Sequence, residues 1–435
     1  MKILAESLLR PRLSVAMIVR DEQEVLAESI ESVGNIADEI VVLDTGSTDR
    51  TPELAAELGA TVHHTPWEND FSSARNHCLR FVTGSWVLWL DAGERIRPQD
   101  ATELRRFLDE QANSVVAYSV WVETPPREES ASAEQCLQVK LLPTRADLRF
   151  FGRVRETLSD SLQLAGLQIA EAPCRIVRHP RQHEPQRLMA KARRDLALAS
   201  AEAEVVGEWS PRLFLVSGQA HGILGDQDQA REMLRRAAEI SPPGSAQRLE
   251  AFYGLLTTFD EDPDLHASQL TACLDSLEDF PFDLQLLLAL GNYMLVRERL
   301  DLAIRAFEAA VRYGRITPAV WHLCEVREIA AVCLGLALQA RQRDDEACSV
   351  LETALAARPE SLRLLRQLQN VYRKLGKSAE ALALAKRLPS SLLAIDPDPR
   401  SAREDRQQLR FDAGRRIAGV LVPHIAALKG QAVSE

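Results

Sequence analysis

The feature that most constrains the fold of this chain is a change in hydrophobic periodicity near residue 180. Before it, short apolar runs alternate with helical segments, and after it the sequence has an almost continuous helical pattern. A chain of 435 residues also exceeds the size that one hydrophobic core usually organises. The change of period therefore predicts an N-terminal α/β domain followed by an all-α region.

Three apolar runs carry the strand signal in the first domain: Leu13–Val19, Glu39–Leu43 and Trp86–Leu90. A helical segment comes after each of the first two runs, at Glu24–Val33 and at Thr51–Leu58. This alternation predicts a mostly parallel, Rossmann-like sheet covered by helices. Ligands of such sheets bind beyond the carboxyl ends of the strands, so the polar residues directly after the runs are the candidates for chemistry.

Three further strands are expected at Ser114–Val122, Cys136–Leu142 and Gln168–Val177. The proline- and charge-rich segment Pro180–Pro185 marks a boundary after them. We place the N-terminal domain at residues 1–182, a helical solenoid at 186–393 and a C-terminal helical cap or tail at 394–435.

The helical region repeats. Gly recurs with Ala twelve residues later, followed at fixed offsets by a large apolar residue, Ala and, in two copies, Pro. The copies begin at Gly218, Gly291 and Gly335, and weaker copies lie around Gly254 and Tyr372. This pattern resembles the tetratricopeptide repeat, a helix-turn-helix unit whose small residues let paired helices approach closely. Because one unit cannot bury its own apolar face, the units are expected to stack.

Composition excludes several classes of protein. The net charge of −11 argues against a general nucleic-acid binder, whose surface would be basic. Seven scattered cysteines without a Cys-x-x-Cys pair predict free thiols in a reducing compartment. No apolar run is long enough for a membrane span and the N-terminus does not resemble a signal peptide, so we expect a cytoplasmic protein.

Four blocks, in order, carry a second resemblance: LSVAMIVRDE, DEIVVLDTGSTDRT, NDFSSARNHCL and GSWVLWLDAGE. Together they resemble family 2 glycosyltransferases of the GT-A fold, in the bacterial subgroup joined to tetratricopeptide repeats. The resemblance covers about residues 12–195. It implies a domain that binds a nucleotide-sugar, with UDP as the expected nucleotide.

The resemblance assigns nucleotide contacts to Asp44 and Arg75, and places Arg20 near the base. A carboxylate such as Asp44 can accept a hydrogen bond from a base N–H, while Asp49 or Ser47 is expected to cap the following helix. A guanidinium such as Arg75 suits both a flat ring and phosphate oxygens. Solvated loop or surface charges are the alternatives for Arg20 and Arg75. We expect Asn76 to support the loop.

Asp91 comes directly after the third apolar run. The family normally has Asp-x-Asp here, and the resemblance implies that these carboxylates hold ribose and a divalent cation, Mn²⁺ or Mg²⁺, which prefers oxygen ligands. Here the second aspartate is Gly93, and Glu94 would point to the opposite face of an extended segment. Three possibilities remain open: a cation bound through Asp91 with Glu94 or His179, a metal-independent enzyme, or an inactive domain.

For an inverting transfer, the resemblance points to the segment FFGRVRETL. Glu156 is the candidate base that takes the acceptor's proton, with a solvated carboxylate at a helix start as the alternative. Arg155, where relatives often have His, is the candidate phosphate stabiliser. The pair His63-His64 is expected after a short strand, away from these loops, and is assigned no role.

The predicted function is transfer of a sugar from a nucleotide-sugar to an acceptor, which the repeats would present if it is a protein or peptide. Polysaccharide or lipopolysaccharide assembly is an alternative acceptor chemistry. A degenerate transferase kept as an interaction scaffold is an alternative of another class. A nucleotidyltransferase would need a glycine-rich phosphate loop after the first strand, and Arg20–Glu24 contains no glycine.

Overall fold

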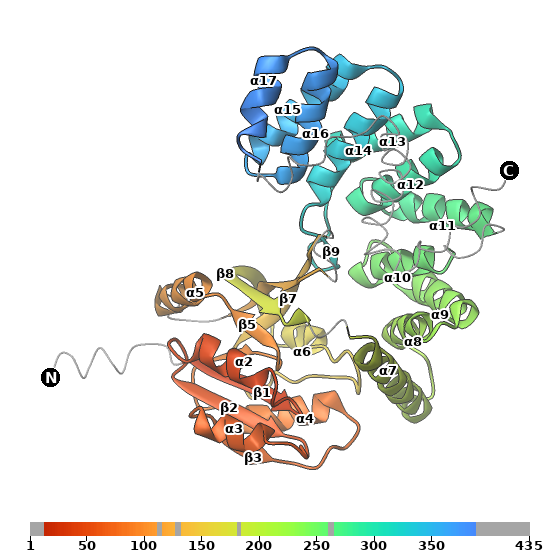
Figure 1. Cartoon of the computed structure of the whole chain (residues 1–435). Helices are drawn as coiled ribbons and strands as arrows, with labels where there is room; N and C mark the ends of the chain where they lie inside the picture. The colour runs from red at the N-terminus through yellow and green to blue at the C-terminus, as the bar shows by residue number, and fades with distance from the viewer. Residues whose placement is uncertain (1–12, 111–114, 127–131, 181–183, 260–264, 389–435) are drawn as a thin grey trace. The chain divides into compact units, whose positions relative to one another are not determined.

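The computed structural model describes residues 13–110, 115–126, 132–180, 184–259 and 265–388 (Figure 1). Contacts divide the chain into two compact units, Met1–Met233 and Leu234–Glu435. The predicted domain limits at 182, 186 and 393 remain predictions, and the expected cap or tail at 394–435 lies outside the described residues.

The first unit is built on a mixed sheet whose strands run in the order β3-β2-β1-β4-β7-β6-β8-β5. β1, β2, β3 and β4 are parallel neighbours, β7 and β6 add antiparallel pairs, β8 is parallel to β6, and β5 is antiparallel to β8. The α/β fold class is thus confirmed, and the parallel character is concentrated in the first half. The strands are β1 (Leu13–Val19), β2 (Glu39–Asp44), β3 (Thr61–His64), β4 (Trp86–Trp89), β5 (Glu94–Ile96), β6 (Val116–Thr124), β7 (Glu134–Pro143) and β8 (Gln168–Arg178).

Helices connect and cover these strands because the central strands are apolar on both faces. Met17, Leu43 and Leu88, from three neighbouring strands, are fully buried. Asp70 caps α4 by accepting a hydrogen bond from the Ser73 amide at 2.9 Å. The helices are α2 (Leu26–Val33), α3 (Thr51–Glu57), α4 (Phe71–Cys78), α5 (Pro98–Glu110) and α6 (Ser159–Leu164), with a short 3₁₀ turn at Leu79–Phe81.

Two helices beyond the expected boundary also belong to the first unit: α7 (Pro185–Val206) and α8 (Pro211–Leu224). Val154, in the loop before α6, is buried in a cluster with α7 and α8 side chains that include Leu198 and Leu213. Arg212 donates to the carbonyl of Val154 and to the Glu202 carboxylate. These contacts tie the loop that carries Glu156 to the first helices of the chain's helical region.

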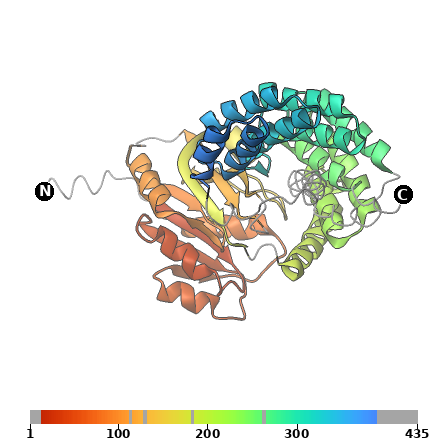
Figure 2. The same cartoon turned by 45° about the horizontal axis from the view of Figure 1, so that its top comes forward.

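The remaining helices stack in chain order, as Figure 2 shows. The close approach that the repeat pattern predicts is present: a Cβ on Gly291 would lie 2.2 Å from the Phe307 ring, and one on Gly335 would lie 3.1 Å from Leu351. The predicted helical class of this region is confirmed, with the two-residue strand β9 as an addition. The elements are α9 (Gln227–Ile240), α10 (Ala246–Thr257), α11 (His266–Asp279), α12 (Leu284–Val296), α13 (Leu300–Tyr313), β9 (His322–Leu323), α14 (Val326–Ala340), α15 (Asp344–Ala357), α16 (Leu362–Lys374) and α17 (Ser378–Ala385).

Among the helices that the structure describes, none combines the length and apolar character that a bilayer crossing requires.

Candidate active site

The loops after β1 and β2 are fixed to each other by reciprocal hydrogen bonds. The amide of Asp21 donates to Ser47 Oγ at 2.9 Å, and the Asp21 carboxylate accepts from the Thr48 amide at 2.7 Å. Asp49 accepts from the amides of Thr51 and Gln23 at 2.9 and 3.3 Å. The N-cap of α3 is Arg50, without a side-chain capping bond, so the expectation that Asp49 or Ser47 caps this helix is wrong. Asp49 instead bonds the amide of Thr51, the first residue of α3, and Ser47 bonds the neighbouring loop. Two adjacent parallel strands thus end in one rigid rim.

Asp44 ends β2 at this rim and its side chain is almost fully buried. Its carboxylate accepts from the amides of Gly46 and Ser47, at 3.1 and 3.2 Å, so it also shapes its own turn. The ring of His64 lies 3.3 Å from Asp44 Oδ2. The expectation that His63-His64 lies away from these loops is wrong, because β3 pairs with β2 in a register that sets His64 beside Asp44.

Arg75, on α4, contacts several other residues of the site. Its guanidinium stacks over the Trp89 ring at 4.3 Å and donates to Asp91 Oδ1 at 3.1 Å and to Glu156. Burial alone would lower the pKa of Arg75, but Glu156 and Asp91 raise it above its ordinary value. The group is therefore a fixed cation.

Asn76 positions one wall around Arg75. Its amide donates to the carbonyl of Phe150 at 2.9 Å and accepts from the Phe150 amide at 2.8 Å. Phe150 in turn lies against the Arg75 guanidinium, 5.3 Å from ring centre to carbon. These bonds match the loop-supporting role expected of Asn76.

Asp91 lies where β4 ends and remains 37% exposed, which makes it the most open carboxylate of the group. Oδ1 accepts from Trp89 Nε1 at 3.0 Å as well as from Arg75, and Oδ2 accepts from Lys140 Nζ at 3.0 Å. Burial would raise the pKa of Asp91, but the charges of Lys140 and Arg75 outweigh it and hold that pKa far below its ordinary range. The carboxylate is therefore ionised at neutral pH.

Gly93 turns the chain so that Glu94 faces Asp91. Gly93 has a φ of 84°, and the Glu94 amide donates to the Asp91 carbonyl at 2.9 Å, which closes a tight turn. The expected extended segment is therefore absent here. Glu94, only 1% exposed, accepts from Lys140 at 2.6 Å and from Arg178 at 3.2 Å.

His179 enters the same neighbourhood through its backbone. Its amide donates to the Gly93 carbonyl at 2.7 Å, next to the pairing of Glu94 with Arg178 between β5 and β8. The structure thus brings the three expected metal-site residues, Asp91, Glu94 and His179, into one region.

The loop before α6 presents Glu156. Phe151 and Thr157 exchange two backbone hydrogen bonds of 2.9 Å, which close the loop, and Glu156 reaches Arg75 with a side chain only 10% exposed. Arg155 occupies a left-handed conformation (φ 47°), and its guanidinium donates to Gln219 of α8 at 3.2 Å. Glu156 and Arg155 therefore point to different surroundings.

The predicted residues thus fall into two groups. Direct hydrogen bonds join the members of the first group, which are Arg75, Asp91, Glu94 and Glu156. Asp44 lies apart from them, at the end of a strand on the same sheet edge, two strands from β4. At the usual interstrand spacing that is roughly 10 Å. The Arg20 side chain is half exposed and lies 3.9 Å from Asp21, as expected of a loop charge.

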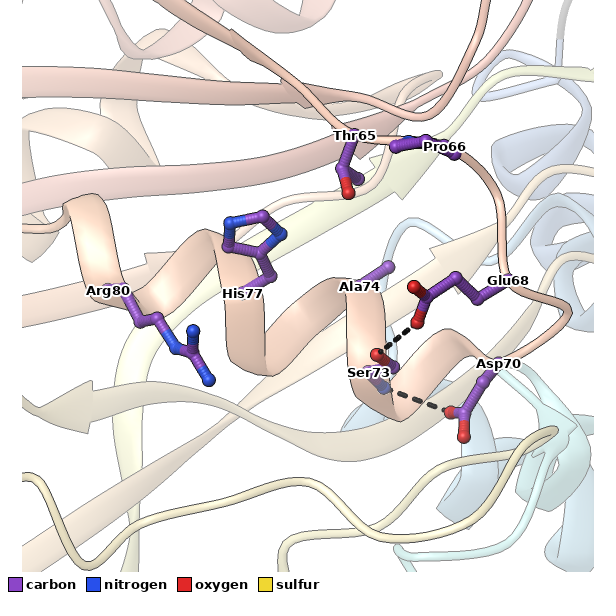
Figure 3. Close-up of a pocket in the computed structure, with 8 residues that line it drawn as sticks. All are labelled: Thr65, Pro66, Glu68, Asp70, Ser73, Ala74, His77 and Arg80. Carbon is purple, nitrogen blue, oxygen red and sulfur yellow. Dashed lines mark hydrogen bonds between the residues drawn. The ribbon is translucent and has the colours of Figure 1, made fainter.

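A cavity of about 240 Å³ lies on the other face of α4, lined by residues that include Ser73, His77 and Arg80 (Figure 3). Helical periodicity places these side chains opposite Arg75. None of the predicted site residues lines this cavity.

Lys140, Arg178 and Trp89 also bond residues of the site, and none of them was predicted from the sequence. Lys140 is the most informative of these because it is a buried ammonium on β7, 5% exposed, between two carboxylates. The available signal was a lysine inside an apolar strand, in the segment QVKLLP, since lysine is almost never buried unless paired.

Comparison with known proteins identifies the family of this chain. Residues 14–178 match the description of glycosyl transferase family 2, and residues 211–243 match a tetratricopeptide repeat. A TPR repeat-containing protein of Synechococcus elongatus is 32% identical over 312 residues, which cover 69% of this chain and 75% of that protein. The chain belongs to the family 2 glycosyltransferases that carry tetratricopeptide repeats. The transferase domain and its named relatives support glycosyl transfer as the activity.

Other relatives match a smaller share of this chain. An uncharacterized glycosyltransferase of Rickettsia bellii is 31% identical over 114 residues, which cover 26% of this chain and 38% of that protein. This chain therefore spans less than two fifths of that relative. A solved structure of glucosyl-3-phosphoglycerate synthase from Mycobacterium tuberculosis with Mn²⁺, UDP and glucosyl-3-phosphoglycerate is 20% identical, with a TM-score of 0.29 over 38% of this chain and 71% of that one.

The residues around Asp91 do not fit a divalent cation in this arrangement. Such an ion takes several free oxygen ligands, yet all four carboxylate oxygens of Asp91 and Glu94 already accept hydrogen bonds. In the described parts of the chain, no cluster of three or more His, Cys, Asp or Glu side chains is placed to hold a metal ion.

Proposed function

We propose that this glycosyltransferase binds a UDP-sugar along the edge formed by Asp44, Arg75 and Asp91. The main observation behind the proposal is that Arg75 bonds both Asp91 and Glu156. These bonds connect α4, the end of β4 and the loop of Glu156. These segments are far apart in sequence. A fixed arginine beside an open carboxylate suits a diphosphate next to a ribose.

Asp44 would read the base. Its carboxylate has about four acceptor positions, and bonds from Gly46, Ser47 and His64 leave capacity for one more donor. Uracil offers a ring N–H there and cytosine does not. The roughly 10 Å from Asp44 to the Asp91 turn is a span that one extended nucleoside diphosphate can bridge.

Transfer would proceed by inversion. The acceptor hydroxyl oxygen forms a bond to the anomeric carbon, the bond from that carbon to the diphosphate oxygen breaks, and UDP leaves with the electron pair. Glu156 takes the acceptor proton. Its Oε1 bonds Arg75, and among the described residues the structure gives Oε2 no partner, which leaves that oxygen for the acceptor. Arg155, which faces Gln219, is a weaker candidate for phosphate.

The repeats would present the acceptor. Repeat arrays form concave surfaces that bind extended peptides, so a protein or peptide acceptor in the cytoplasm is our first candidate. Polysaccharide or lipopolysaccharide assembly is the second.

A degenerate transferase in an interaction scaffold is the alternative from another class. Gly93 favours it, because the glycine removes a carboxylate from the usual motif. In that case the repeats would be the functional part of the protein.

The test is release of UDP from common UDP-sugars by the full chain, with and without Mn²⁺. We expect release with at least one donor. Asp91→Asn should abolish it, while Asp228→Asn, an exposed aspartate on α9, should behave as wild type. Absence of both UDP release and UDP binding would support the scaffold and contradict the enzyme.

A further inference from the structure

Lys140 occupies the position between the two carboxylates of the Asp91 turn. Its ammonium lies 3.0 Å from Asp91 Oδ2 and 2.6 Å from Glu94 Oε2. Both contacts are within charge-assisted hydrogen-bond range. A divalent cation that used both residues would need the same space and the same oxygens.

The bonded group is also balanced in charge. Its carboxylates are Asp91, Glu94 and Glu156, and its cations are Arg75, Lys140 and Arg178, so three negative charges meet three positive ones. Before a diphosphate binds, an added divalent ion would leave an excess of two positive charges in this group. Displacement of Lys140 would leave a buried ammonium without its partners, which is strongly unfavourable.

Gly93 stands where the family motif has its second aspartate. A second aspartate at this position would add a fourth carboxylate and make the group net negative, the condition that a cation relieves. A Cβ on Gly93 would lie 3.5 Å from Val25 and 3.6 Å from His179, in ordinary contact, so the glycine is explained by its φ of 84° and not by lack of space. The chain has one carboxylate fewer than the motif and a lysine bonded to those that remain.

We infer that Lys140 takes the place of the divalent cation, so that this site binds a nucleoside diphosphate without metal. The inference rests on the proposed function. Lys140 acts as a positioning residue: it neutralises Asp91 and Glu94 and fixes the turn against which the diphosphate lies, while Arg75 meets the phosphate oxygens. A cation held by Asp91 with Glu94 or His179 is the opposing account.

Calorimetric titration of the full chain with UDP, in EDTA and then in Mn²⁺, decides between them. We expect wild-type affinity to change less than about twofold between the two conditions. Lys140→Met should lose at least about tenfold in EDTA and recover with Mn²⁺, because its free carboxylates can then bind the ion. Electron paramagnetic resonance should detect bound Mn²⁺ in this variant and none in the wild type.

Two controls keep the test decisive. Lys140→Arg retains the charge and should bind UDP without metal, and Lys191→Met removes an exposed lysine on α7 and should match the wild type. If Lys140→Met does not fold, the wild-type comparison still decides. UDP binding only with Mn²⁺ would overturn this inference and leave the proposed function standing. No UDP binding in either condition would overturn the proposed function itself.

Discussion

Some residues of the site could be predicted from sequence motifs, and others could not. Asp44, Arg75 and Asp91 could be selected because each lies in a recognisable block directly after a strand or on the helix that comes next. Lys140, which bonds Asp91 and Glu94, lies on β7, and Arg178, which bonds Glu94, lies on β8. The register that pairs these strands with β4 and β5 cannot be predicted from any local sequence pattern. His64 was misplaced for the same reason.

The buried carboxyl group of Asp283 should make the stability of the protein depend on pH. It caps α12, accepts from the Leu286 amide at 2.9 Å and from the Tyr253 hydroxyl at 2.7 Å, and burial raises its pKa from 3.8 to about 6. Above pH 3.8 the unfolded state ionises first, so this group's stabilising contribution is lost as pH rises towards 6. The loss is up to about 3 kcal/mol.

We therefore expect Asp283→Asn to be more stable than wild type at pH 7 and similar at pH 3.5, roughly 0.3 units below the ordinary pKa of an aspartate. Asparagine keeps both hydrogen bonds and cannot ionise. Unfolding midpoints across this range measure the difference. A difference that does not vary with pH would contradict the argument.

The helices and strands were predictable where local periodicity decides them. β1, β2 and β4 lie within one residue of the predicted runs, and β6 is displaced by two residues. β5 could not be predicted, because it has only three residues and forms through its pairing with β8. The role of α7 and α8 in anchoring the loop of Glu156 was also invisible, since it arises from tertiary contacts.

Gly291 tests the packing of the repeats at the scale of one helix pair. Gly291→Ala would drive a methyl group into the Phe307 ring, and we expect a loss of about 1–3 kcal/mol in the free energy of unfolding. Phe307→Leu should recover part of it. Gly222→Ala is the control, because its Cβ would lie 3.8 Å from Ala230, in ordinary contact. We expect this substitution to raise the free energy of unfolding by about 0.5–1 kcal/mol. Equal stability of Gly291→Ala and wild type would refute close packing here.

Arg212 tests the anchoring of the loop before α6. Arg212→Met removes the donor to Val154 and to Glu202, so the amides from Val154 to Thr157 should exchange faster with deuterium. Sugar transfer should fall about tenfold with UDP affinity nearly unchanged, because Glu156 loses its position. Arg187→Met, an exposed arginine on α7, is the matched control. Unchanged exchange would show that the helices do not hold the loop.

The whole chain consists of two compact units. The change of hydrophobic period near residue 180 predicted an α/β part and a helical part, but it did not predict where the contacts between residues divide the chain. The sequence boundary coincides with the end of the strands, whereas the contacts divide at residue 233, after α7 and α8. Periodicity reports secondary structure, and it does not report which sheet or loop a helix packs on.

Two units predict two thermal transitions of the full chain. UDP at about a hundred times its dissociation constant should raise the transition of the first unit by roughly 5–10 °C and leave the other unchanged. Gly291→Ala should lower only the second transition. Differential scanning calorimetry measures both, and one transition that responds to both changes would contradict independent units.

The claim on which the account depends is that Asp44 and Asp91, at the ends of two parallel strands, bind one nucleotide. The direct measurement is calorimetric titration of UDP into wild type, Asp44→Asn, Asp91→Asn and the control Asp228→Asn. The account predicts binding to wild type and control, and a loss of at least about tenfold in each of the other two. Equal UDP affinity in all four proteins would contradict it.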